Sequence, residues 1–213
     1  MTKPYTEDDL ASQLSQDVAW RVREISDLKA AVHRADATAK NSLLRALVTI
    51  CYAHWEGHVK FSAQKFMQHI TLRKFQFSAL DRQFLKNHFL PRLGSLAQKG
   101  IFDRSELIDL ILDSGNDRFS KINDDLINTR SNLNYEVLLE LCHVCGINGS
   151  LFEEKSTFID VVLLKRRNSI AHGEDTLVGV EEIDSLPDDT IGLMRTFSNE
   201  LQTKAYLKGY MAA

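Results

Sequence analysis

Residues 44–66, LRALVTICYAHWEGHVKFSAQKF, form the clearest periodic pattern in the sequence and decide the fold class. Apolar side chains recur there at steps of mostly three or four residues, the spacing that keeps them on one face of an α-helix. Gly57 is the only glycine in the pattern, and Asp36 upstream is a suitable N-cap residue. The sequence therefore predicts a long helix that begins near Asp36. The apolar positions are Leu44, Leu47, Val48, Cys51, Trp55, Val59, Ala63 and Phe66.

A second amphipathic helix is expected immediately before the first. Thr6 is followed three residues later by Asp9, a pairing typical of a helix N-terminus. The helix would run to about His33, with apolar residues again three or four positions apart. Because the link between the two helices is short, they are expected to form an antiparallel hairpin. The apolar positions are Leu10, Leu14, Val18, Val22, Ile25 and Leu28.

Shorter helices are predicted over the rest of the chain, and the polar residues 116–132 could form a loop or a surface-exposed segment. Three prolines and ten glycines are too few for the tight turns of a β-sandwich or barrel. The predicted fold is an all-α helical bundle built on the long antiparallel hairpin, with residues 1–213 in a single domain. The shorter helices are expected near 78–90, near 103–113 with Asp103 or Ser105 as cap, from Asn134 to Cys145, from Ser156 to Gly173, and from Pro187 to about Leu207.

Composition narrows the function classes. The formal net charge of −3 argues against a strongly basic nucleic-acid coat protein but permits a small basic site. The three cysteines and the absence of an apolar leader are typical of a protein in the reducing cytoplasm. No apolar run approaches the length of a membrane span, so no membrane association is expected.

The segment from Arg167 to His172, RNSIAH, carries the strongest candidate chemistry. It can be interpreted as an ordinary helix end, since cations in a last turn and a following glycine are common. A functional interpretation is also open. Asn168 and His172 are one helical turn apart, so the amide could orient the imidazole. Arg167 would add a planar cationic fork, and Lys165 and Arg166 would add local positive charge.

This pattern resembles the ribonuclease motif of the HEPN superfamily, an Arg usually followed by Asn, Asp or His, and then a His after four to six residues. The segment YAHWEGHVK at 52–60 is also similar to the Trp-Glu segment of the MAE_28990/MAE_18760-like HEPN nucleases. The resemblance spans about residues 5–208 in architecture and is specific at these two segments. It implies an all-α fold and a metal-independent endoribonuclease without a cofactor.

The resemblance also implies roles for individual residues. Arg167 would bind and polarise the scissile phosphate, and His172 would assist proton transfer as the RNA 2′-hydroxyl attacks. The products would carry 2′,3′-cyclic phosphate and 5′-hydroxyl ends. Asn168 would orient His172 or contact RNA, and two copies would form a homodimer with the active site at the shared cleft. The protein would act as a toxin or antiphage effector. Some related toxins carry a Tyr two residues after the His, where an antitoxin modifies them. Glu174 occupies that position here, so a cognate antitoxin would act differently.

Alternatives remain open for the other polar residues. Glu56 could be a solvated carboxylate or could face the cleft and pair with Arg167 or His172. Asp160 could pair with a basic neighbour, although a structural role is favoured. The spacing of His54 and His58 would suit zinc, but with only Glu56 nearby as a third ligand no metal site is expected. Cys142 and Cys145 have Cys-x-x-Cys spacing and are interpreted as core residues. The alternative function is a non-catalytic HEPN module that binds RNA, a nucleotide or a protein partner.

Overall fold

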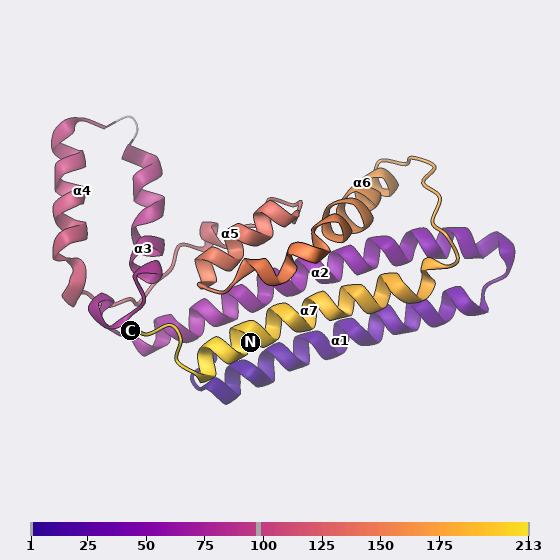
Figure 1. Cartoon of the computed structure of the whole chain (residues 1–213), viewed down its shortest axis with the longest axis horizontal. Coiled ribbons are helices and arrows are strands. Elements are labelled where there is room, and N and C mark those ends of the chain that lie inside the picture. Colours follow the sequence, from indigo (N-terminus) through magenta and orange to yellow (C-terminus); the bar gives the residue numbers. More distant parts are fainter. Residues whose placement is uncertain (1, 97–98, 213) are drawn as a thin grey trace.

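The computed structural model describes residues 2–96 and 99–212, and three long helices form its main body (Figure 1). Helices α1 (Glu7–Arg34), α2 (Ala37–Arg73) and α7 (Glu182–Tyr206) pack against one another along their lengths. Only Ala35 and Asp36 separate α1 from α2, which confirms the predicted hairpin. The described residues contain no β-strand, and the all-α fold class is confirmed.

Local hydrogen bonds explain where these helices begin. Thr6 and Asp9 form a capping box, in which each side chain accepts from the backbone N–H of the other. Asp36 accepts from the backbone N–H of Ala39 at 2.9 Å and caps α2. Both caps agree with the sequence prediction. Helix α2 continues beyond the periodic pattern and ends at Arg73, before a left-handed Lys74.

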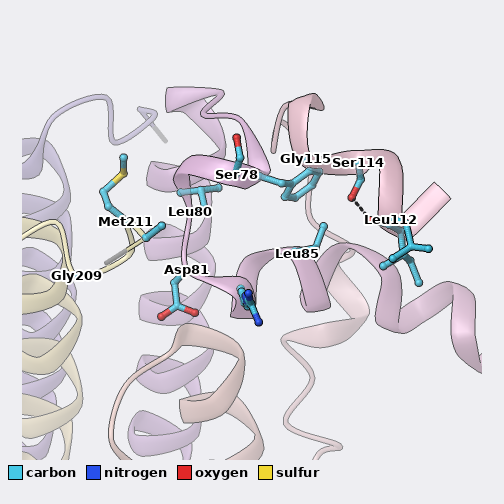
Figure 2. Close-up of a pocket in the computed structure, with 13 residues that line it drawn as sticks. Ser78, Leu80, Asp81, Leu85, Leu112, Ser114, Gly115, Gly209 and Met211 are labelled. Atoms are coloured by element: carbon cyan, nitrogen blue, oxygen red, sulfur yellow. Dashed lines mark hydrogen bonds between the residues drawn. The ribbon is translucent and has the colours of Figure 1, made fainter. Parts of the chain in front are cut away.

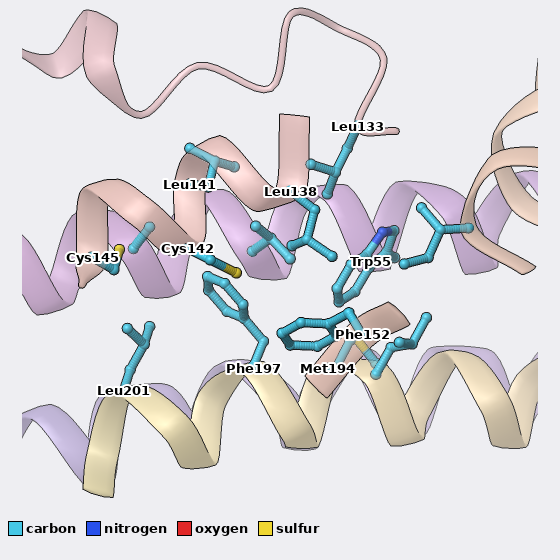
Figure 3. Close-up of a cluster of buried hydrophobic side chains, with 14 of the residues drawn as sticks. Trp55, Leu133, Leu138, Leu141, Cys142, Cys145, Phe152, Met194, Phe197 and Leu201 are labelled. Carbon is cyan, nitrogen blue, oxygen red and sulfur yellow. The ribbon is translucent and has the colours of Figure 1, made fainter. Parts of the chain in front are cut away.

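Shorter helices cover one side of α2 (Figure 1). They are α5 (Tyr135–Cys145), the 3₁₀-helix η5 (Gly149–Lys155), the π-helix η6 (Phe158–Lys165) and α6 (Arg166–Ala171). As predicted, Asn134 caps α5 and Gly146 ends it in the left-handed region at φ 66°. Trp55 of α2 is fully buried and packs against Phe152, which in turn contacts Phe197 of α7 (Figure 3). The expected core role of Trp55 is therefore confirmed.

The two cysteines of the Cys-x-x-Cys pair also belong to the core. Cys142 and Cys145 are buried beside Leu138 and Leu141 (Figure 3), as the sequence suggested. Burial raises the pKa of the Cys142 thiol to about 12 and the pKa of Cys145 above that of an ordinary thiol. These thiols therefore stay protonated and serve packing.

Helices α3 (Arg82–Ser95) and α4 (Ile101–Asp113) form an arm that projects away from the main body at one end (Figure 1). The 3₁₀ turns η1 (Phe77–Ala79) and η3 (Ser114–Asn116) lie at its base, and η4 (Asp124–Leu126) is the only helical turn described in the following polar segment. Gly100 is the N-cap residue of α4, so the expectation that Asp103 or Ser105 caps this helix is wrong.

Two further boundaries differ from the sequence prediction. Helix α7 begins at Glu182, so Pro187 lies inside its second turn instead of opening it. The apolar run Phe158–Lys165 is a π-helix, although its sequence suggested an ordinary α-helix. This wide turn changes how the following residues face the body, because each π turn holds more residues than an α turn.

A buried polar network joins α1 to α2. The Asp17 carboxylate accepts hydrogen bonds from Arg21 Nε at 2.8 Å and from His58 Nδ1 at 2.7 Å. Burial alone would raise the pKa of Asp17, but the bonds from His58 and Arg21 outweigh it and lower the pKa. Asp17, Arg21 and His58 are at most 8% exposed. The charges are thus paired within the bundle, as buried ions must be.

Gly57 lies where this network passes over α2. A Cβ atom at this position would lie 2.7 Å from Nη1 of Arg21, closer than van der Waals contact allows. The interruption of the apolar pattern in α2 therefore has a packing cause. The glycine makes room for a buried guanidinium.

Candidate functional site

Helix α6 presents the RNSIAH segment at the end of a continuous helical run. His172 follows the last helical residue, and its backbone N–H bonds to the carbonyl of Asn168 at 2.9 Å. Gly173 has a φ of +80°, and the N–H groups of Gly173 and Glu174 close a Schellman motif on Ile170 and Ser169. His172 is exposed at this helix terminus. The expected helix stop at Gly173 is confirmed.

Arg167 is held by three neighbours from two other parts of the chain. Its Cζ atom lies 4.1 Å from the ring centroid of Tyr52, in cation–π geometry. Its Nη2 donates to the Ser131 carbonyl at 3.0 Å and lies 3.7 Å from Glu56 Oε2. The side chain remains 22% exposed. The guanidinium is therefore fixed in orientation while part of it faces solvent.

Helix α2 supplies both the ring and the carboxylate of this site. Tyr52 and Glu56 are four residues apart, so they lie on neighbouring turns of the same face. Of the two open interpretations of Glu56, the structure favours pairing with Arg167, since the Glu56 side chain is 19% exposed and points to the guanidinium.

The segment from Thr129 to Asn134 is the third part of the chain at this site, beside α6 and α2. Arg130 and Ser131 are consecutive non-glycine residues in the left-handed region, with φ of 54° and 58°. Such residues cost about 1–3 kcal/mol each and persist where surrounding contacts fix them. Here the Leu133 N–H donates to the Tyr52 hydroxyl at 2.7 Å, and Ser131 accepts from Arg167. The strained turn is thus tied directly to the site.

Burial and charge set the protonation state of the Tyr52 ring. Burial raises the pKa of Tyr52 to about 12, and the negative charge of Glu56 acts in the same direction, while Arg167 opposes them. The phenol therefore stays neutral at physiological pH. It offers Arg167 a π face and the Leu133 N–H an acceptor oxygen.

Asn168 is engaged differently from the expectation. Its Nδ2 donates to the Asn132 side-chain oxygen at 3.2 Å. Among the described residues, the His172 imidazole has no hydrogen-bond partner, so the expected Asn168–His172 bond is absent from this structure. The physical reason is that the Asn132 side chain of the 129–134 segment accepts from the Asn168 amide instead.

The predicted basic cluster is partly neutralised. Arg166 forms a close ion pair with Glu182 of α7, and Arg167 has Glu56 beside it. Lys165 is exposed. The site is therefore a set of oriented and paired cations instead of an unbalanced positive patch.

Comparison with known protein families decides the relationship. A family model described as RiboL-PSP-HEPN matches residues 16–203. The chain belongs to the HEPN superfamily. The match confirms the resemblance inferred from the Arg167–His172 and Trp55–Glu56 segments, but it does not confirm the narrower MAE-type subfamily. Neither the curated proteins nor the solved structures gave a match.

Several other polar residues that the sequence of this HEPN chain singled out make contacts within the fold. Asp160 accepts from the backbone N–H of Tyr135 at 2.7 Å and so supports the start of α5, which agrees with the structural role favoured for it. His54 Nε2 lies 2.7 Å from Glu24, and His58 bonds Asp17. Within the described residues, no three His, Cys, Asp or Glu side chains are grouped to hold a metal ion.

Ser62, His58 and Asp17 have the contacts of a hydrolase catalytic triad. Ser62 Oγ lies 3.2 Å from His58 Nε2, and His58 Nδ1 lies 2.7 Å from Asp17 Oδ2. A nucleophile, base and acid would have such contacts. Ser62 and His58 have no exposed surface, however, and His58 Nε2 also bonds the Met194 carbonyl at 3.1 Å. No substrate can reach this serine, so the arrangement serves the packing of α1, α2 and α7.

A bilayer-spanning helix must be both long enough and apolar enough to cross the hydrocarbon core. None of the described helices of the chain combines the two properties.

Proposed function

We propose that this HEPN chain is a metal-independent endoribonuclease that acts as a toxin or antiphage effector in a prokaryotic cytoplasm. The observation that carries the proposal is the Arg167 guanidinium, which is oriented by Tyr52, Glu56 and Ser131 near a helix end that exposes His172. A fixed planar cation and a free imidazole are the groups needed at a phosphodiester.

The reaction follows from the chemistry of RNA. The 2′-hydroxyl attacks the adjacent phosphorus, the O2′–P bond forms, and the P–O5′ bond breaks. Arg167 stabilises charge on the phosphoryl oxygens, while His172 accepts the proton of the 2′-hydroxyl. The leaving 5′-oxygen must receive a proton, and we propose that His172 of a second copy supplies it across a shared cleft. The nucleophile is part of the substrate, so it is already positioned.

Supporting residues would act on binding. Asn168, with its amide on Asn132, would contact RNA together with the 129–134 segment instead of orienting the imidazole. Lys165 is free to approach a phosphate, whereas Arg166 would first have to leave Glu182. A cognate antitoxin would cover the exposed helix end at His172.

The test is RNA cleavage by the purified protein in EDTA. We expect 2′,3′-cyclic phosphate and 5′-hydroxyl ends, no cleavage of the matching DNA, which lacks the nucleophile, and loss of activity in His172→Ala. His143→Ala is a matched control, because His143 is also an exposed histidine in the last turn of a helix. Cleavage by His172→Ala at the wild-type rate would show that the site is wrong. RNA binding without cleavage, lost in Arg167→Ala, would instead support a non-catalytic binding module.

A further inference from the structure

For its length, the arm formed by α3 and α4 exposes more large apolar side chains than the rest of the chain. Helix α4 has 13 residues, of which Leu107 is the only buried one. Ile101, Ile108 and Leu112 are 75%, 57% and 74% exposed, and they follow one another at steps of seven and four residues. This spacing places them on one face of the helix. An exposed apolar face of this kind marks an interaction surface.

The apolar surface continues to the base of the arm. A hollow of about 860 Å³ lies there between the start of α3 and the end of α4 (Figure 2). Leu85 of α3 and Leu112 of α4 line it, together with Leu80 and Met211 (Figure 2). The stripe of α4 therefore leads into a concave surface that a partner could fill.

The two helices of the arm carry opposite charges. The arginine and lysine residues of α3 have no acidic neighbour within the helix, whereas α4 has four carboxylates and one arginine. The basic residues are Arg82, Lys86 and Arg92; the acidic residues are Asp103, Glu106, Asp109 and Asp113. Arg92, Asp103 and Glu106 line a smaller hollow between the two helices. Those charges face one another within one chain.

The other four of these charged side chains have no opposite charge facing them within the described part of the chain. Arg82, Lys86, Asp109 and Asp113 are exposed, and none of them forms an ion pair with another described residue. The positions of Arg82 and Asp113 also oppose the helix dipoles, because a cation begins α3 and a carboxylate ends α4. Each such placement is unfavourable by about 0.3–1 kcal/mol for a helix in isolation. An opposite charge from outside the chain would remove this cost.

We propose that the arm of a second copy docks on this surface, with α3 of each copy against α4 of the other. A two-fold axis along the arm makes this contact self-complementary. Arg82 begins α3 and Asp113 ends α4, while Lys86 and Asp109 each lie one turn further, about 6 Å along their helices. The opposite charges therefore match in level, and the apolar stripe of α4 is covered.

A second copy fits better than other occupants. The carboxylates of α4 repel RNA and anionic lipid, which would need a basic surface. Each copy contributes one basic α3 and one acidic α4, so each α3 of the pair can face an α4 of the other copy. The arm lies at the opposite end of the molecule from α6 (Figure 1), so this interface is separate from the proposed nuclease cleft.

Charge reversal tests the proposal by mixing. One variant carries Arg82→Glu and Lys86→Glu, and another carries Asp109→Lys and Asp113→Lys. We expect each variant alone to have a lower mass than the wild type in light scattering, because only the separate cleft contact proposed above would remain. An equimolar mixture of the two variants should recover the wild-type mass. Mixing cannot relieve repulsion within one chain, so recovery isolates the contact between copies. Reversal of Asp27 and Glu154, which are exposed outside the arm, is the control and should leave the mass unchanged.

Three results would overturn the proposal: a wild type that is monomeric in light scattering, variants that keep the wild-type mass, or a mixture that does not recover it. If the variants stay at wild-type mass but bind another protein through Ile108 and Leu112, the arm has a different partner. Circular dichroism of each variant checks that it is folded. RNA cleavage is measured on the same variants and should be unchanged, because the arm lies away from α6, so failure of the arm contact is distinct from failure of the nuclease.

Discussion

Replacing Gly57 by alanine should destabilise this protein, although the same change stabilises most helices. Alanine in a helix interior is favoured over glycine by about 1 kcal/mol. At Gly57, however, the new Cβ would lie 2.7 Å from Arg21 Nη1. The guanidinium cannot simply swing away, because Arg21 is buried and donates twice to Asp17.

The magnitude follows from what Arg21 would lose. Breaking a buried ion pair outright costs about 3–5 kcal/mol. The rigid guanidinium must shift as a whole, because Nη2 and Cζ would also lie 3.2 and 3.3 Å from the new Cβ. A small shift lengthens its bonds to Asp17 without breaking them, and Nη1 itself makes only long contacts of 3.4 Å to His54. We therefore expect a net destabilisation of about 1–3 kcal/mol after the helix gain is subtracted. At about 2–4 °C per kcal/mol for a chain of this size, Tm should fall by about 2–12 °C.

Thermal and urea unfolding followed by circular dichroism measure this effect. Gly192→Ala in α7 is the matched control, since Gly192 is also helical and its Cβ would meet nothing within 4 Å. We expect this control to raise stability by up to about 1 kcal/mol. In an Arg21→Met background the clash disappears, and Gly57→Ala should then stabilise as well. If Gly57→Ala raises Tm as Gly192→Ala does, the steric argument is refuted.

Three further outcomes are expected. Tyr52→Phe keeps the ring beneath the guanidinium and should lower RNA cleavage less than Tyr52→Leu, with the loss of Tyr52→Leu appearing mainly in kcat; equal losses would contradict a cation–π role. Burial lowers the pKa of His54, His69 and His88, so the folded state binds their protons less well than the unfolded state. Stability should therefore fall as pH drops below about 6.5, and a Tm constant from pH 7.5 to 5 would contradict this. All three cysteines are buried with a raised pKa, so their thiols should react with a colorimetric disulfide reagent only after unfolding, and rapid native reaction would contradict their placement.

The main helices could be predicted because local rules and tertiary packing agree there. The apolar steps of residues 44–66 follow from one buried face, and Thr6, Asp36 and Asn134 are short polar residues with a nearby N–H to cap. The Arg167 and His172 pair could be suggested because both residues lie in one short segment that resembles the HEPN motif. Glu56 was suggested by its place beside Trp55.

The remainder of the site depends on contacts between distant segments. The left-handed Arg130 and Ser131 are not glycines, so their sequence gives no sign of this backbone. Tyr52 reads as one more apolar residue of α2, and its contact with Arg167 appears only when α6 packs on that helix. The π-helical hydrogen bonds before Arg166 likewise have no simple sequence signature. For Arg130 and Ser131, the only signal in the sequence was the polar character of residues 116–132.

The π-helix before α6 also allows the chain to lose one residue without moving α6. A π turn closes with hydrogen bonds one residue longer than those of an α turn, so it holds an extra residue. Removing one residue between Phe158 and Lys165 can be absorbed when the wide turn tightens, and α6 then keeps its place. Helix α6 has no wide turn that could absorb a deletion. Removing one of its residues therefore turns His172 by about 100° relative to Tyr52 and Glu56. Length variation is therefore tolerated on one side of Arg166 and excluded on the other.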